Sequence, residues 1–389
     1  MKITLSAVKC DVGGLGGHSK PSERLLKEVK GYVHDFVKRQ YRGLLMDYYI
    51  GHTGDDIHIL MSHIKGKNNR DIHQFTWNTY MHGTAVAKDQ GLYGAGQDLL
   101  KDAFAGNVKG TGIGYAEIEF EERPNEAIIL LTGDKMGPGG WNLILYKAYT
   151  ESPGLILQPD MFDGFAFNIM DVAYKKGDRV IKLKAPERLS DLKALLRDEH
   201  RFVIESIYTA DGEPVAVLST ERLHNIAGKY TGKDDPIGII RTQKRFPATG
   251  EVIEYFKLCP YITGDMRGSH RTALTPVKKN SNMSFMDGPS VTSALSFSVH
   301  DGIFTEPNDL FDDAAEFWSH IRKKAAQKNE HMREQEWFGC AMASMDELEY
   351  TGIMEKLEKL DKEFIVRESK KEIWPTEKET IIQDPPSGD

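Results

Sequence analysis

Four aspartate-bearing turns divide this chain, and each of them interrupts or follows an apolar segment. Each turn contains glycine or lies close to one, which lets the backbone bend tightly and approach a ligand. The six carboxylates held on these turns would repel one another unless cations lie between them. The turns span residues 10–18, 54–56, 133–135 and 233–235, and their carboxylates are those of Asp11, Asp55, Asp56, Asp134, Asp234 and Asp235.

Carboxylate oxygens are hard donors, which favour magnesium, above all where a phosphate supplies the remaining ligands. The turns therefore predict a site for magnesium and phosphate. Any one turn, taken alone, is equally well an ordinary surface turn, because aspartate and glycine are the usual turn residues. Two Asp-Asp doublets, and a lysine directly after Asp134, favour the metal interpretation for the set.

The composition is that of a globular protein: 389 residues, 40% apolar and 28% charged, enough for one large domain or two of usual size. A net charge of -8 argues against a dedicated nucleic-acid binder, which would carry a basic stripe. The three cysteines lie far apart, so neither a zinc knuckle nor a disulfide framework is predicted. The N-terminal residues lack a secretion signal, and no apolar run approaches the ~20 residues of a membrane span. We expect a cytoplasmic protein.

The apolar periodicity predicts many strands with helices scattered among them, which is typical of layered sheets covered by helices. We expect strands at 2–9, 44–50, 57–64, 113–120, 127–132, 143–150, 165–172 and 180–183, and a hairpin formed by 202–208 and 215–218. We expect helices after Pro21, over 70–88 and 97–105, from Pro186 to Arg197, and over 310–329 and 345–363. The chain shows no internal repeat and no clear domain boundary.

Familiar nucleotide and hydrolase motifs fail on their spacing. The dinucleotide fingerprint would need glycine where the chain has Ser19 or Glu117. The P-loop, HExxH and GxSxG patterns do not occur either. These failures favour metal and phosphate chemistry on a fold that is not a nucleotide-binding one.

The segment 228–236 puts a phenol, amines and two acids side by side. Lysine can form a Schiff base with a ketone, but only as the neutral amine. Desolvation and nearby divalent cations would lower the pKa of Lys233, whereas bare aspartates would raise it. Tyr230 could move the proton next to the imine carbon. Taken alone, the same segment is also typical of a solvated loop.

The chain resembles the bifunctional fructose-1,6-bisphosphate aldolase/phosphatase family of archaea and some bacteria, over nearly its whole length. The matching strings include Gly54-Asp55-Asp56-Ile57-His58, Gln90-Gly91-Leu92-Tyr93-Gly94-Ala95-Gly96-Gln97-Asp98, Ala105-Gly106-Asn107, Tyr230–Pro236, Met266-Arg267-Gly268-Ser269-His270, Met286-Asp287-Gly288-Pro289 and Glu349-Tyr350-Thr351. The resemblance implies an α+β fold, a four-layer α-β-β-α sandwich in a single large domain over residues 1–374, followed by a polar tail over 375–389. It also implies a homo-octamer with several Mg²⁺ ions in each active site.

By position, the resemblance implies a role for each matching residue. The catalytic residues would be Asp11, Tyr230 as the aldolase acid/base and Lys233 as the Schiff-base lysine. The metal ligands would be Asp11, His18, Asp55, Asp56, Gln97, Asp134, Asp234 and Asp235. Contacts to phosphate and sugar would come from His18, Tyr93, Gly106, Asn107, Asp134, Lys135, Gln243, Lys244, Arg267, Asp287 and Tyr350.

The implied activity is gluconeogenic: condensation of dihydroxyacetone phosphate with glyceraldehyde 3-phosphate, then hydrolysis of the 1-phosphate to give fructose 6-phosphate. The chain departs from the family at Thr272-Ala273, where Gly-Pro is expected, and at Ser290, where proline often stands. Both departures flank implied substrate contacts and bear on the fine shape of the sugar pocket. Two other interpretations stay open, namely a magnesium phosphatase without aldolase activity and a non-catalytic assembly protein stabilised by divalent cations.

Overall fold

The structure is a computed structural model, and it describes residues 1–16, 18–39, 43–96, 98–99, 113–174, 178–219, 221–222, 235–266, 270–282, 289–312, 315–334 and 352–367. Within these residues, no helix is long and apolar enough to cross a membrane. The predicted division into a domain over 1–374 and a tail over 375–389 stays a prediction, because the described chain ends at residue 367.

Two large sheets form the framework. The first has five strands in the order β10-β4-β1-β3-β2, all paired antiparallel. Its strands are β1 (Lys2–Cys10), β2 (Asp47–Thr53), β3 (Asp56–His63), β4 (Gly114–Glu121) and β10 (Glu221–Arg222).

The second sheet has eleven strands, with the main order β14-β15-β5-β11-β9-β8-β6-β7-β18. Its strands are β5 (Glu126–Asp134), β6 (Phe165–Asp171), β7 (Arg179–Ala185), β8 (Phe202–Thr209), β9 (Pro214–Leu218), β11 (Ile237–Thr242), β14 (Thr275–Pro276), β15 (Val291–His300), β16 (Ile303–Phe304), β17 (Asn308–Asp309) and β18 (Ile365–Val366). A separate pair joins β12 (Ile262–Met266) to β13 (His270–Ala273).

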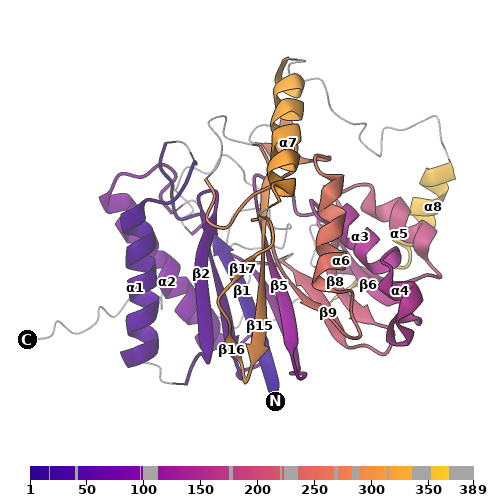
Figure 1. Ribbon diagram of the computed structural model, residues 1–389, viewed down its shortest axis with the longest axis horizontal. Coiled ribbons are helices and arrows are strands. Elements are labelled where there is room, and N and C mark those ends of the chain that lie inside the picture. Colours follow the sequence, from indigo (N-terminus) through magenta and orange to yellow (C-terminus); the bar gives the residue numbers. More distant parts are fainter. Residues whose placement is uncertain are drawn as a thin grey trace, which may run out of the picture.

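Helices cover the outer face of each sheet, which gives four layers (Figure 1). The first sheet is covered by α1 (Glu23–Arg39) and α2 (Arg70–Asp89), on the left in Figure 1. The second is covered on the right by α3 (Asn142–Thr150), α4 (Gly154–Leu157), α5 (Leu189–Leu196) and α6 (Thr249–Glu254). Further along the chain lie α7 (Phe317–Glu334) and α8 (Gly352–Asp361).

Three apolar layers separate these four layers of backbone. Side chains alternate along a strand, so one strand can serve two layers. In β5, Ile128 and Leu130 face the first sheet, whereas Ile129 and Leu131 face the helices of the second. The predicted α-β-β-α sandwich is confirmed.

Most of the predicted elements are present, but one is of the wrong type, and the helix expected over 97–105 lies outside the described residues except for 98–99. The expected strand at 143–150 is helix α3. The buried residues of this segment recur at helical spacing, namely Ile144, Leu145, Ala148 and Tyr149, whereas Leu143 is exposed. In a short apolar run this spacing cannot be told from that of a buried strand. Strands β11 and β15 of the second sheet were not predicted.

Candidate active site

The predicted carboxylates meet at one end of the two sheets. Asp11 directly follows β1, Asp55 lies in the turn between β2 and β3, and Asp56 begins β3. Asp134 ends β5, and Asp235 precedes β11, which runs antiparallel to β5. Because neighbouring strands in these pairs run in opposite directions, the end of one and the start of the next lie at the same edge. Strand order thus brings together residues far apart in the sequence.

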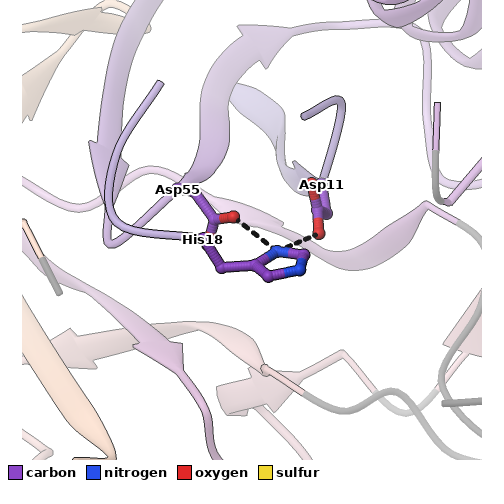
Figure 2. A group of neighbouring side chains, drawn as sticks. All are labelled: Asp11, His18 and Asp55. Carbon is purple, nitrogen blue, oxygen red and sulfur yellow. Dashed lines mark hydrogen bonds and ion pairs between the residues drawn. The ribbon is translucent and has the colours of Figure 1, made fainter. Parts of the chain in front are cut away.

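The acidic side chains form two groups in which ligand atoms lie within 4.8 Å of one another. One group is Asp11, His18 and Asp55, and the other is Asp56, Asp134 and Asp235. In the first group, His18 Nδ1 lies 2.9 Å from Asp55 Oδ2 and 3.6 Å from Asp11 Oδ2 (Figure 2). The second group draws on both sheets, since Asp56 belongs to the first sheet and Asp134 to the second.

The glycine-rich loop after β1 holds the first group in place. The backbone N–H of Asp11 donates to Asp98 Oδ2 at 2.9 Å, and that of Gly13 donates to Asp11 Oδ1 at 3.0 Å. A Cβ at Gly14 would lie 2.8 Å from Asp55 Oδ2, so only glycine fits against this carboxylate. The loop therefore supplies close approach and fixed geometry around Asp11 and Asp55.

Three cationic side chains balance the carboxylates. The Lys9 ammonium contacts the Asp56 carboxylate, and both residues are buried. Lys135 Nζ lies 3.3 Å from Asp55 Oδ1 and 3.2 Å from Asp134 Oδ1, so it bridges the two groups. Burial opposes the charged form of His18, but its hydrogen bonds to Asp11 and Asp55 outweigh this and raise its pKa to about 9.

The cluster is still short of positive charge, which fits a divalent cation. Burial raises the pKa of Asp134 to about 7. The Lys135 ammonium lowers this pKa, but the negative charges of Asp55 and Asp235 raise it again in part. Asp134 Oδ2 and His18 Nε2 are buried without a hydrogen-bond partner. Buried polar atoms normally have partners, and carboxylate oxygens with one imidazole suit a hard divalent ion.

Lys9 was missed from the sequence, although a signal for it exists. It continues the face of β1 that carries Leu5 and Ala7, which point between the sheets. A lysine at an inward position needs a buried anion, and here it is Asp56.

Tyr93 is the one further predicted substrate contact that the described residues bring to this site. Its backbone pairs with Gly14, and its ring packs edge-on against that of His18 with centroids 4.8 Å apart. The side chain is 45% exposed, so a ligand could reach it. Its role stays a prediction.

Gln243 and Lys244 are not brought to the cluster within this chain. They follow β11, whereas Asp235 precedes it, so the length of that strand, about 20 Å, separates them. Both are exposed, and Lys244 Nζ donates to the Pro124 carbonyl at 2.6 Å. The other predicted site residues lie outside the described part of the chain: Gln97, Gly106, Asn107, Tyr230, Lys233, Asp234, Arg267, Asp287 and Tyr350.

Thr272 and Ser290, the two expected departures from the family pattern, contact each other. Thr272 Oγ1 lies 2.6 Å from Ser290 Oγ, and the Ser290 N–H donates to Thr272 Oγ1 at 2.9 Å. The Ser290 hydroxyl also donates to the carbonyl of Lys135. Lys135 has a positive φ of 58°, a conformation that non-glycine residues adopt at some cost. Ser290 therefore hydrogen-bonds to the backbone of Lys135, whose side chain lies between the two carboxylate groups.

Comparison with known proteins agrees with this geometry. The family model described as fructose-1,6-bisphosphatase matches residues 2–365. A Thermus thermophilus protein named fructose-1,6-bisphosphate aldolase/phosphatase is 50% identical over 368 residues, which cover 94% of this chain and 100% of that protein. Proteins of the same name from Cenarchaeum symbiosum and Ignicoccus hospitalis are 45% and 40% identical, over 94% and 93% of this chain and 95% and 93% of their own lengths. The chain belongs to the fructose-1,6-bisphosphatase family.

Proposed function

We propose that this chain is a bifunctional fructose-1,6-bisphosphate aldolase/phosphatase that depends on Mg²⁺. The observation that carries the proposal is the pair of carboxylate groups gathered from both sheets at one end of the sandwich. Relatives bearing that activity in their name match the chain over nearly its full length, which supports it further.

In the phosphatase half, the carboxylate groups would hold Mg²⁺, and the bound metal would polarise the 1-phosphate and stabilise the charge that develops on it. Asp11, His18 and Asp55 would hold one ion, and Asp56, Asp134 and Asp235 another. The Lys135 ammonium lies between the groups, where it can also contact a phosphate oxygen. Water then attacks phosphorus, the bond from phosphorus to the sugar oxygen breaks, and that oxygen takes up a proton.

In the aldolase half, the neutral amine of Lys233 attacks the ketone of dihydroxyacetone phosphate and expels water to form an imine. Tyr230 removes the α-proton, and the resulting carbanion attacks the aldehyde carbon of glyceraldehyde 3-phosphate. Water releases the bisphosphate from Lys233. The same segment carries the predicted ligands Asp234 and Asp235, so we expect it to change conformation between the two steps.

Three further features belong to the proposal. An octameric assembly is implied by the family resemblance, and a cytoplasmic location is a prediction from the sequence. Gln243 and Lys244 would bind substrate only if their end of β11 came close to an active site, which does not happen within one described chain.

The test uses the full chain and two assays. The first measures phosphate release from fructose 1,6-bisphosphate with Mg²⁺ and in excess chelator. The second measures borohydride trapping of a covalent adduct with dihydroxyacetone phosphate. We expect metal-dependent release and a trapped adduct. Phosphate release without an adduct would mean that the chain is a magnesium phosphatase alone. The absence of both phosphate release and adduct would mean that it is a structural protein.

A further inference from the structure

Three buried hydroxyl groups form a closed ring between the sheets. Thr53 Oγ1 lies 2.7 Å from Thr132 Oγ1 and 2.9 Å from Ser293 Oγ, and the last two oxygens lie 2.6 Å apart. The three residues are at most 1% exposed. Each hydroxyl carries one proton, so a ring in which each donates to the next satisfies all three. We call this set the hydroxyl triangle.

The hydroxyl triangle ties one sheet to the other. Thr53 is the last residue of β2, in the first sheet, while Thr132 and Ser293 lie opposite each other on β5 and β15, in the second. Directional bonds of 2.6–2.9 Å at this point hold β2 in one lateral position over β5 and β15.

The same residues adjoin the second carboxylate group. Thr53 is the cross-strand partner of Asp56, and Thr132 lies two residues before Asp134 on the same face of β5. Two residues along a strand span about 7 Å. The hydroxyl triangle thus lies within two residues, along β5, of the place where the carboxylates of Asp56 and Asp134 come together from the two sheets.

Stability alone does not account for hydroxyls at this depth. Further along the same face of β5, Leu130 and Ile128 pack in the apolar layer between the sheets. A hydrogen bond between buried hydroxyls contributes little net stability, and apolar groups of the same shape can be nearly as stable. What valine could not supply is a directional contact that specifies how the sheets sit relative to each other.

We infer that Thr53, Thr132 and Ser293 are positioning residues for the metal site: the hydroxyl triangle sets the register of the two sheets so that Asp56 and Asp134 close on one divalent cation. The inference rests on the proposed metal site. It concerns only residues of the sandwich interior, and does not depend on Lys233 or on either enzymatic activity.

The experiment measures cation binding directly. Metal-stripped full-length protein is titrated with Mn²⁺, and free Mn²⁺ is followed by electron paramagnetic resonance. Thr53→Val and Thr132→Val keep the shape of the side chain and remove the hydroxyl. We expect each to weaken Mn²⁺ binding at the affected site about tenfold or more, the usual effect of removing an outer-shell contact. Thr53→Ser, which keeps the hydroxyl, should restore binding to within about twofold of wild type.

Thr242→Val is the matched control. Thr242 is a buried threonine of β11 whose hydroxyl lies 2.9 Å from that of Thr249, at the far end of the strand from Asp235. It should lower the melting temperature about as much as Thr53→Val, yet leave Mn²⁺ affinity unchanged. Ser293→Ala opens the hydroxyl triangle from its third corner and repeats the test if a valine variant fails to fold.

Two outcomes would overturn the inference. If the wild type binds Mn²⁺ and the Thr53, Thr132 and Ser293 variants bind it equally well, the hydroxyl triangle is only structural and the proposed function stands. If the wild type binds no Mn²⁺, the positioning role and the proposed metal site fall together. The double variant T53V/T132V should bind no worse than either single variant, because one substitution already opens the ring.

Discussion

Ser290 and Thr272 lie in a continuous chain of hydrogen bonds that ends on Lys135. The Ser290 N–H donates to the Thr272 hydroxyl, which donates back to Ser290 Oγ, and the Ser290 hydroxyl donates to the Lys135 carbonyl. Ser290 is wholly buried, and Lys135 Nζ contacts carboxylates of both metal groups. Thr272 and Ser290, the two expected departures from the family pattern, thereby support the backbone of Lys135.

Ser290→Ala should lower the free energy of unfolding by about 1–3 kcal/mol, because it leaves the buried Lys135 carbonyl without its donor. Urea unfolding followed by circular dichroism measures the change. Ser298→Ala is the control on β15, the strand that Ser290 directly precedes: Ser298 is exposed, and loss of its hydroxyl should change stability by less than about 0.5 kcal/mol. Equal effects of the two substitutions would show that the Ser290 hydroxyl contributes nothing.

Asp134→Asn should separate metal binding from folding. The amide keeps the shape of the side chain but removes a negative charge from a buried cluster that contains Asp56 and Asp235. We expect the metal-free variant to melt no lower than the metal-free wild type, to gain no melting temperature on addition of Mg²⁺, and to release no phosphate. Differential scanning calorimetry with and without Mg²⁺ checks this.

Asp163→Asn is the matched control for charge removal, since Asp163 is exposed and belongs to none of the groups of described side chains that could hold a metal ion. It should keep the full response to Mg²⁺. A metal-free Asp134→Asn protein that melts well below the wild type would contradict the view that these carboxylates destabilise the unloaded fold.

Lys233→Arg should abolish condensation of the two triose phosphates and borohydride trapping, while some phosphate release remains. Arginine keeps the positive charge near Asp234 and Asp235, but its guanidinium stays protonated and cannot attack a ketone. Both activities are assayed on one purified variant. Condensation at a near wild-type rate would rule out Lys233 as the Schiff-base residue.

Glu117 should account for part of the loss of stability in acid. It accepts hydrogen bonds from Ser6 at 2.7 Å, His73 at 2.9 Å and the Asn68 N–H at 2.6 Å. Burial opposes its charge, but these contacts, led by His73, lower its pKa from 4.5 to about 2. A carboxyl whose folded pKa is lowered stabilises the fold above its unfolded pKa, and that stabilisation disappears as the pH falls towards the folded value.

Glu117→Gln should therefore cost on the order of 3 kcal/mol near pH 7, and progressively less between pH about 4.5 and 2. Urea unfolding at several pH values measures the difference from wild type. Glu119→Gln, two residues along the same strand and less buried, should show a much smaller difference. A Glu117→Gln difference that stays constant with pH would disprove the linkage.

The sequence predicted the elements whose period is clear and the turns that carry the acids. It failed for 143–150, because Leu143, Ile144 and Leu145 form a short apolar run that fits a buried strand and a buried helix equally well. It missed β11, every residue of which is buried, so that its sequence shows no alternation. It also missed β15, whose first five residues are all buried and which alternates between buried and more exposed residues only from Ser296 on.

The carboxylates of the candidate site could be named from the sequence alone, because four aspartate-bearing turns that contain or adjoin glycine follow or interrupt apolar segments, and the set of four favours a shared site over ordinary surface turns. Which of them lie close enough together to form one group was decided only by the tertiary structure. Asp55 and Asp56 are adjacent in the chain, yet Asp55 joins Asp11 and His18 while Asp56 joins Asp134 and Asp235. The physical reason is twofold. Side chains that follow one another in the sequence point to different sides of the backbone, and the face-to-face packing of two sheets brings residues from distant parts of the sequence together. The contact of Lys9 with Asp56, the hydroxyl triangle and the distance of Gln243 from the cluster follow from the same packing, which local sequence patterns do not encode.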